Sequence, residues 1–316
     1  MNTSEQLPEQ IYLVDASIYI FQSHFSQYVE CYDDDGGELS ALFGFTQFLL
    51  QFLRRSEPSH VAIALDESLF CGFRHELCPN YKSNRELPDE NLAMQLRACR
   101  EVCELLGLPA FASRVFEADD IIGTLSNRIR QEAQGNTALT ILTRDKDLGQ
   151  LLQADADCLW DYAKNTRRSR ADLRADLGID PEQLPDFLGL AGDNVDCISG
   201  VPGVGPVKAK ALLQEFKSLE DVYANLDKVA ALPLRGAAGL ANKLAEHQEL
   251  ARLSKKLATI VVSVEDAQES FGSSCIAELA RQPVLADEFQ DFLATYRFSA
   301  SDRSRLLAAV SRVIQP

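Results

Sequence analysis

Three short apolar segments, each with an aspartate near its carboxyl end, constrain the fold of this chain more than any other feature. They are residues 11–17 (IYLVDAS), 61–68 (VAIALDES) and 138–147 (ALTILTRDKD). Each predicts a buried strand of about five residues. Helical patterns accompany them at 39–55, 90–106 and 118–133. Because strands that alternate with helices form a parallel sheet covered on both faces, the first half predicts an α/β fold.

The aspartates of these segments are Asp15, Asp66 and Asp145. One of them could be an ordinary turn residue. In open α/β sheets, however, sites form beyond the carboxyl ends of the strands. The strand ends therefore predict that these three carboxylates meet, although they are far apart in the sequence.

After about residue 178 the strand patterns stop and helical patterns take over. They cover 181–190, 206–216, 218–225, 240–258 and 284–312, with the Gly/Pro-rich VPGVGP at 201–206. We therefore expect an α/β core in 1–178 and a helical region in 179–316, packed as one catalytic unit.

Charge and hydropathy exclude some classes of protein. The 316 residues carry a net charge of −16, which argues against a protein coated with nucleic acid. Residues 164–174 (KNTRRSRADLR) are a local basic exception. No apolar run approaches the ~20 residues of a membrane span, and the polar start does not resemble a signal peptide. We expect a cytoplasmic protein.

The eight cysteines are irregularly spaced and include no CxxC pair. A zinc site from Cys71, Cys78, Cys99 and Cys103 is an open alternative. Free thiols in a reducing compartment are the favoured interpretation.

Further acids accompany those of the strand ends. RVFEADDIIGTLSNRI (114–129) places three acids at the start of a helix, where they could simply complement the helix dipole. Asp147 follows Asp145, and LAGDNVDCISG supplies two acids spaced i, i+3. The full candidate set is Asp15, Asp66, Glu117, Asp119, Asp120, Asp145, Asp147, Asp193 and Asp196.

If these carboxylates converge, they repel one another unless cations are bound or some are protonated. Oxygen-only ligands without histidine suit Mg²⁺ or Mn²⁺. Two such ions could activate water and stabilise the leaving oxygen at a phosphodiester. The alternative is a set of acids scattered over the surface of an acidic protein.

Two further segments could contact a nucleic acid. In GVPGVGPVKAKALLQEF (200–216), glycines allow outward-pointing amides and the helix that starts near Pro206 offers an anion site. Such contacts hold a backbone without reading its sequence, although a plain helix connection is the alternative. In FRHELCPNYKSNRELPDE (73–90), Lys82 and Arg85 could hold a phosphate and Tyr81 could stack on a base. A solvated surface loop is the default for such a segment.

Together these segments resemble the 5′ nuclease (flap endonuclease) family, which includes the amino-terminal nuclease domain of bacterial DNA polymerase I and phage flap endonucleases. The motifs are YLVDAS (12–17), YKSNRELPDE (81–90), EADDIIGTL (117–125), TRDKDLGQLL (143–152), DFLGLAGDNVDCISGVPGVGPVKAKALL (186–213), LSKKLATI (253–260) and YRFS (296–299). The chain ends where a polymerase would continue, so we expect a free-standing nuclease.

The resemblance implies a PIN-like (Rossmann-like) core with a mixed sheet, a helical arch at about 72–103, and a helix–three-turn–helix element. It implies that Asp66, Glu117, Asp119 and Asp120 surround a first metal ion, with Asp15 nearby. It implies that Asp145, Asp147, Asp193 and Asp196 surround a second. It also implies that Tyr81, Lys82 and Arg85 hold the scissile phosphate.

The 200–208 hairpin would grip duplex DNA, with K⁺ on its carbonyls. The expected DNA-contacting residues are Gly200, Val201, Gly203, Val204, Gly205, Lys208, Lys210, Arg144 and Arg74. The implied activity is that of a monomeric, divalent-metal-dependent (Mg²⁺ or Mn²⁺, two ions) 5′→3′ exonuclease and flap endonuclease acting on DNA.

Four positions depart from the family pattern. Gln22 replaces a phosphate-contacting arginine, Arg144 replaces a glycine, Cys197 lies where asparagine is common, and Ala16 replaces a glycine. Gln22 motivates an alternative, a DNA-structure-binding protein with weak or no cleavage. A PIN-type ribonuclease is a third hypothesis.

Overall fold

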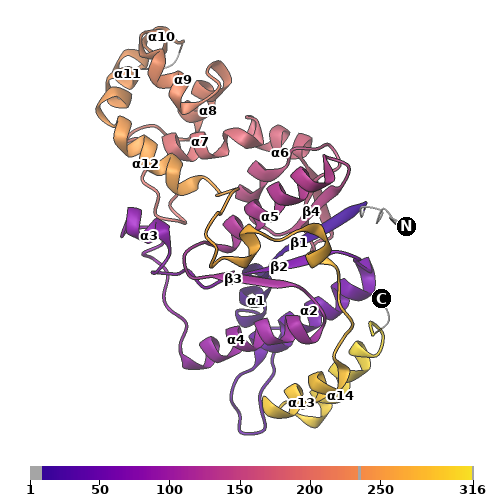
Figure 1. Cartoon of the computed structure of the whole chain (residues 1–316). Helices are drawn as coiled ribbons and strands as arrows, with labels where there is room; N and C mark the ends of the chain where they lie inside the picture. The colour runs from indigo at the N-terminus through magenta and orange to yellow at the C-terminus, as the bar shows by residue number, and fades with distance from the viewer. Residues whose placement is uncertain (1–8, 234–235, 315–316) are drawn as a thin grey trace.

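A six-stranded sheet forms the centre of the molecule (Figure 1). The computed structural model describes residues 9–233 and 236–314. In the order β3-β2-β1-β4-β5-β6, the strands are β3 (Ala110–Ser113), β2 (Val61–Asp66), β1 (Gln10–Asp15), β4 (Ala138–Leu142), β5 (Cys158–Asp161) and β6 (Thr166–Ser169). All neighbours are parallel except β5 and β6, so the sheet is mixed.

The pleat of the strands divides the core into two layers. In β1, Tyr12 and Val14 pack into one hydrophobic cluster, whereas Ile11 and Leu13 pack into the other. The first cluster includes side chains of α1 (Ala16–His24), α2 (Ser40–Ser56), α4 (Glu90–Leu105), α13 (Ala286–Thr295) and α14 (Ala300–Val310). The second includes α5 (Ala118–Ala133), η1 (Asp147–Leu151), α6 (Arg170–Leu177), η3 (Ser270–Gly272) and η4 (Ile276–Leu279).

A separate helical lobe lies at the upper left of Figure 1 and has its own hydrophobic cluster. Its elements are η2 (Pro181–Gln183), α7 (Leu184–Ala191), α8 (Pro206–Glu215), α9 (Leu219–Ala224), α10 (Leu226–Ala231), α11 (Ala237–Glu246) and α12 (Gln248–Ala258). The short α3 (Phe73–Leu77) lies beside this lobe.

The chain returns to the sheet after the lobe. Ile260 and Val264 join the cluster beneath α5, and Phe289 and Leu306 join the cluster of α2 and α4. Residues beyond 259 therefore complete the hydrophobic cores of the first half.

The predicted α/β fold with a helical second half is confirmed, and so are the three predicted strands. The short β3, β5 and β6 were not predicted, because runs of four residues carry little periodicity. The predicted helix at 240–258 is two helices, α11 and α12, and that at 284–312 is α13 and α14.

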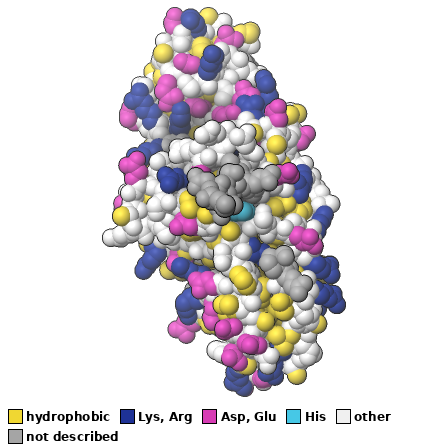
Figure 2. All heavy atoms as spheres, turned by 45° about the vertical axis from the view of Figure 1, so that its right-hand side comes forward, with side chains coloured by type: hydrophobic (Ala, Val, Ile, Leu, Met, Phe, Trp, Pro, Cys, Tyr) yellow, Lys and Arg dark blue, Asp and Glu magenta, His cyan; other side chains and the backbone are white. Residues whose placement is uncertain are grey.

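The basic segment 164–174 does not form a free basic surface. Arg168 pairs with Asp176, and Arg170 and Arg174 pair with Asp180. On the face shown in Figure 2, Lys/Arg and Asp/Glu side chains are interspersed without a continuous basic band. In 9–233 and 236–314, no helix combines the length and the apolar composition that crossing a bilayer requires.

Candidate active site

The carboxyl ends of the central strands carry the first acids of the site. Asp15 ends β1 and Asp66 ends β2, while Asp145 follows β4. β1 pairs with β2 on one side and with β4 on the other, so the strand order reverses here, as at the sites of other α/β sheets. Thr143 Oγ1 donates to Asp15 Oδ2 at 2.9 Å, which ties the ends of β1 and β4 together.

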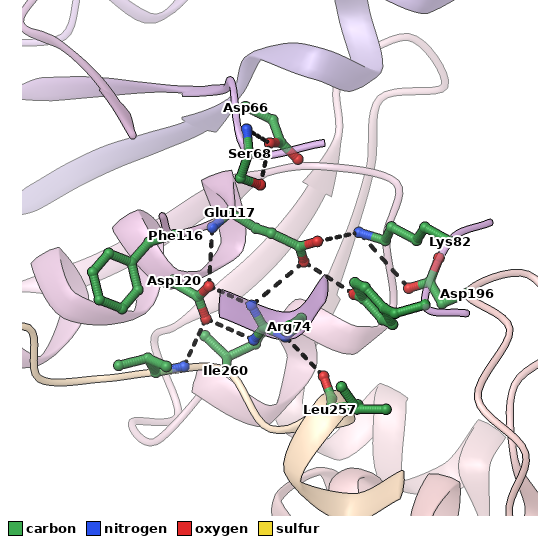
Figure 3. A network of polar contacts seen from close by, with 12 residues as sticks. Asp66, Ser68, Arg74, Lys82, Phe116, Glu117, Asp120, Asp196, Leu257 and Ile260 are labelled. Carbon is green, nitrogen blue, oxygen red and sulfur yellow. Dashed lines mark hydrogen bonds and ion pairs between the residues drawn. The ribbon is translucent and has the colours of Figure 1, made fainter. Parts of the chain in front are cut away.

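Glu117 caps the amino terminus of α5 and faces cations of the 73–85 segment (Figure 3). Lys82 Nζ donates to Glu117 Oε1 at 2.8 Å, and the Tyr81 hydroxyl donates to Oε2 at 3.1 Å. Burial by itself would raise the pKa of Glu117, but Lys82 and Arg74 outweigh it and hold that pKa below its ordinary value.

Asp120 lies one turn further into α5 and is fully buried. Its carboxylate forms a two-pronged ion pair with Arg74, at 2.5 and 2.8 Å. Arg74 is only 3% exposed, so the expectation that it contacts DNA is wrong for this structure. The physical reason is that the α3 backbone turns this side chain inward, toward α5, and not toward solvent.

The second group of acids lies on two loops, the loop after β4 and the loop after α7. Asp145 Oδ1 accepts from the Asp147 amide at 2.8 Å, and Asp193 Oδ1 accepts from the Val195 amide at 2.8 Å. The 193–198 loop is closed by reciprocal backbone hydrogen bonds between Asp193 and Ile198. The two loops that carry the second group of acids are thus short, internally bonded turns.

Several of these acids act on one another electrostatically, which indicates that they lie close together. Burial and then Asp145 and Asp66 raise the pKa of Asp15 to about 7, although the Thr143 hydrogen bond opposes this. Burial and then Asp145 raise the pKa of Asp147 to about 7. Burial, Asp145 and Asp15 likewise raise the pKa of Asp119. These shifts favour acids that lie close together over acids scattered across the surface.

The remaining acids connect the two groups. Asp66 is open to solvent, yet desolvation by the surrounding chain and the charge of Glu117 raise its pKa. Desolvation and the charges of Glu117 and Asp193 raise the pKa of Asp196, against the opposing effect of Lys82. The charges of eight of the nine candidate acids thus act on one another, whereas the Asp120 carboxylate is paired with Arg74.

The donor set fits hard divalent cations. It consists of carboxylate oxygens, and Asp147 Oδ1 is buried without a hydrogen-bond partner in the described part of the chain. Within that part, no three Asp, Glu, His or Cys side chains are close enough together to hold an ion as they stand. Ion binding therefore requires side-chain rearrangement among these acids.

The segment expected to form an arch is only partly helical. α3 ends at Leu77 and α4 begins at Glu90, with turns between them. Within these turns, the Lys82 amide donates to the Asp196 carbonyl at 3.0 Å and Asn84 Nδ2 donates to the Val195 carbonyl at 3.1 Å. Arg85 Nη2 lies 3.1 Å from Asp196 Oδ1. The segment is thus held against the loop of the second group of acids.

The 200–205 hairpin of the helical lobe exposes part of its backbone to solvent. Gly203 and Gly205 are exposed, whereas the Val201 and Val204 side chains are buried in the lobe. Only the backbone of the two valines could therefore meet DNA. Lys208 Nζ donates to the Gly203 carbonyl at 3.1 Å, and α8 begins at Pro206, as predicted.

Two departures from the family pattern lie at the surface. Gln22 is exposed and lines a hollow of about 580 Å³ with Arg54 and Arg55. Arg144 is exposed, with Nε 3.6 Å from Asp161 Oδ2. The zinc alternative is not supported, because Cys99 and Cys103 are fully buried whereas Cys71 is exposed.

Sequence reasoning missed the residues that orient the acids. Besides Thr143, these include Ser68, whose Oγ donates to Asp66 at 2.8 Å. Sequence reasoning also missed Ser254, whose Oγ accepts from the Gly200 amide at 3.1 Å and so holds the hairpin and not an acid. A hydroxyl residue two positions from an aspartate was a usable signal for Thr143 and Ser68. Nothing in the sequence signals the Ser254 contact.

Comparisons with known proteins agree with this arrangement. Residues 10–178 match the family described as "5′-3′ exonuclease, N-terminal resolvase-like domain" and residues 179–273 match that described as "5′-3′ exonuclease, C-terminal SAM fold". DNA polymerase I of Bacillus caldotenax is 33% identical over 96% of this chain and 34% of the polymerase. A 5′-3′ exonuclease of Buchnera aphidicola subsp. Acyrthosiphon pisum is 30% identical over 80% of this chain and 87% of that protein. The chain thus spans about a third of the length of the polymerase relative.

Solved structures share the fold. A T5 5′-exonuclease with divalent zinc ions bound has a TM-score of 0.61 at 17% identity, covering 97% of this chain and 100% of the other. The catalytic core of Rad2 in complex with DNA substrate has a TM-score of 0.60 at 16% identity, covering 98% and 93%.

Proposed function

Because this chain belongs to the 5′-3′ exonuclease family, we propose that it is a divalent-metal-dependent 5′→3′ exonuclease and structure-specific flap endonuclease that hydrolyses DNA phosphodiesters. One observation carries the proposal: eight carboxylates from distant segments influence one another beside the cations Lys82 and Arg85. A negatively charged pocket admits a phosphodiester only if cations offset its charge.

The residues proposed to hold two divalent ions, Mg²⁺ or Mn²⁺, form two groups. The first is Asp15, Asp66, Glu117 and Asp119, and the second is Asp145, Asp147, Asp193 and Asp196. When bound, such ions supply an activated water and stabilise the leaving oxygen. The orphaned Asp147 Oδ1 supports this assignment, because a buried carboxylate oxygen without a donor is costly unless a cation takes its lone pairs.

Lys82 and Arg85 are proposed to hold the scissile phosphate. Lys82 Nζ contacts Glu117 and is 4.0 Å from Asp196, so it already lies between the two groups of acids. These carboxylates hold the pKa of Lys82 well above its ordinary value although burial would lower it, so the amine remains charged. A charged donor there would stabilise the developing charge on the phosphate oxygens. Tyr81 is buried and donates to Glu117, so the expectation that it stacks on a base is wrong for this structure. It would instead keep Glu117 in place.

DNA is proposed to lie along the 200–205 hairpin and the amino terminus of α8. The protein backbone is exposed at Gly203 and Gly205, and Lys208 and Lys210 lie nearby. Such a surface suits binding of the DNA phosphates without contacts to the bases. The proposal also includes a K⁺ ion bound by the hairpin carbonyls. It further includes a role in removing primers and flaps during replication and repair, a monomeric state and a cytoplasmic location.

The test is cleavage of a 5′-labelled flap duplex with Mg²⁺, with Mn²⁺ and with EDTA. We expect short labelled products near the junction that are absent in EDTA and reduced by orders of magnitude in Asp145→Asn. A mobility shift without products would instead identify the DNA-structure-binding protein that Gln22 suggests. Faster cleavage of a matched RNA flap would favour a ribonuclease.

A further inference from the structure

We propose that Asp120 binds no metal ion and instead forms, with Arg74, a positioning pair that fixes Glu117 at the start of α5. The inference deepens the proposed function and rests on it for the metal chemistry. The proposal gives different roles to two neighbouring acids of EADD. Asp119 faces the other carboxylates, whereas Asp120 does not.

The carboxylate of Asp120 has no acceptor capacity left. Oδ1 accepts from Arg74 Nη2 at 2.8 Å and from the Val261 amide at 2.8 Å. Oδ2 accepts from Arg74 Nη1 at 2.5 Å and from the Glu117 amide at 3.0 Å. A carboxylate has about four lone-pair sites, and all are occupied here. An ion would have to displace at least one of these donors from a fully buried group.

The neighbouring charge also opposes a cation at Asp120. The Arg74 guanidinium is almost fully buried and remains charged, so a divalent ion on the same carboxylate would meet a like charge with little water between them. Asp119, by contrast, is partly exposed. Successive residues of a helix point about 100° apart, so Asp119 and Asp120 necessarily face different sides of α5.

The pair joins three segments that the sequence separates (Figure 3). Arg74 also donates from Nε to the Leu257 carbonyl and from Nη2 to the Thr259 carbonyl, both at 2.9 Å. Its Nη1 lies 3.6 Å from Glu117 Oε2. Arg74 thus ties α3 to the end of α12 and to α5. Because Asp120 also bonds the Glu117 amide, the pair sets the position from which Glu117 reaches Lys82.

The first test measures Mn²⁺ binding in the absence of DNA by electron paramagnetic resonance. It compares the wild type with Asp119→Asn and Asp120→Asn. We expect Asp119→Asn to weaken binding at least tenfold and Asp120→Asn to weaken it less than threefold. Equal losses in the two variants would overturn the inference. If the wild type bound no Mn²⁺, the metal part of the proposed function would fail instead.

The second test separates positioning from mere support of the fold. Arg130→Gln is the matched control, since Arg130, also on α5, forms a similar pair with the buried Asp157 at 2.9 Å. At saturating Mn²⁺ we expect Arg74→Gln and Asp120→Asn to lower kcat on a DNA flap at least tenfold with KM unchanged. Arg130→Gln should lower only the thermal midpoint. Unchanged kcat in all three would overturn the positioning role.

A double variant keeps the inference testable if the single variants fail to fold. Arg74→Gln with Asp120→Asn leaves no unpaired charge, and the two amides can hydrogen-bond. We expect it to fold, to bind Mn²⁺ within threefold of wild type and to recover part of kcat. A double variant that folds but has lost Mn²⁺ binding would overturn the inference.

Discussion

At the scale of single residues, Lys82 links the two groups of acids. Its backbone has φ of 50°, a left-handed conformation that non-glycine residues seldom adopt. Its amide is bonded to Asp196 and its amine to Glu117, so the surrounding contacts hold it in this strained form. The strain is localised at the residue proposed to meet the substrate.

We predict that Lys82→Ala slows cleavage more than it weakens binding. The loss of one charged donor at the phosphate should lower kcat by a factor of about 10² to 10³. The dissociation constant for a DNA flap should change less than about threefold, because phosphate contacts elsewhere dominate affinity. Single-turnover cleavage and fluorescence anisotropy measure the two effects. A larger change in affinity than in rate would make Lys82 an anchor only.

The raised pKa of Asp15 predicts the pH dependence of metal-free stability. This pKa is 3.8 as an ordinary value and about 7 in the folded protein, so the folded state binds the proton more tightly. Stability is therefore greatest below the unfolded pKa and falls as the pH rises through about 7. Urea denaturation with EDTA should show this decline, and Asp15→Asn should flatten it.

The matched control for this measurement is Asp155→Asn, because Asp155 is an exposed aspartate on the loop after η1. It should leave the slope of stability against pH as in wild type. A wild-type stability that rises between about pH 5 and about pH 8 would contradict the expected sign.

At the scale of elements, the 192–200 loop depends on Gly192 and Gly200, whose backbones lie in close contact. A Cβ on Gly200 would lie 2.3 Å from the Gly192 nitrogen, and both glycines have positive φ, at 62° and 75°. The loop carries Asp193 and Asp196 and leads into the 200–205 hairpin. The two glycines therefore allow the tight turn and, with it, the placement of Asp193 and Asp196.

We predict that Gly200→Ala lowers the free energy of unfolding by more than about 2 kcal/mol, because it combines backbone strain with a steric clash. Gly205→Ser is the matched control. Gly205 has φ of −89°, a Cβ added to it would meet no atom within 4 Å, and it is the N-cap of α8, where serine is favoured. Urea denaturation should find Gly205→Ser within about 0.5 kcal/mol of wild type. Equal losses would show that the loop tolerates a Cβ at Gly200.

At the scale of the whole molecule, the net charge of −16 is partly concentrated at one site. The acids of that site come from both halves of the chain, and segment 260–313 packs against the sheet of the first half. Repulsion among the acids therefore acts on the packing of the whole chain and not on one lobe.

We predict that divalent ions stabilise the entire protein against heat. A ligand at 100 times its dissociation constant stabilises the folded state by about 2.7 kcal/mol per site, which corresponds to a rise of about 5 °C or more. Differential scanning calorimetry with Mn²⁺ should show this rise, and Asp145→Asn should reduce it by at least half. NaCl at equal ionic strength should give a smaller rise. An equal rise with NaCl would assign the effect to general screening.

Much of the fold follows from local patterns. The strands at 61–66 and 138–142 and the helix at 118–133 were predicted from residue periodicity, which depends on neighbours within a few positions. The three aspartates at strand ends were predicted to meet because parallel strands bring their carboxyl ends to one edge. The strand order and the return of α13 and α14 to the sheet were not predictable, because no local pattern records which distant surface a helix covers.

The sequence by itself determined which residues are proposed to carry the chemistry: the carboxylates, the cations of 81–85 and the glycines of the hairpin. Only the tertiary structure decided which of them remain open to an ion or a phosphate. Asp119 and Asp120 are alike in the sequence, yet Asp120 is buried against Arg74 and Asp119 faces the other acids. The physical reason is that the partner of a buried charge is set by the segments that meet around it, here α3, α5 and the end of α12.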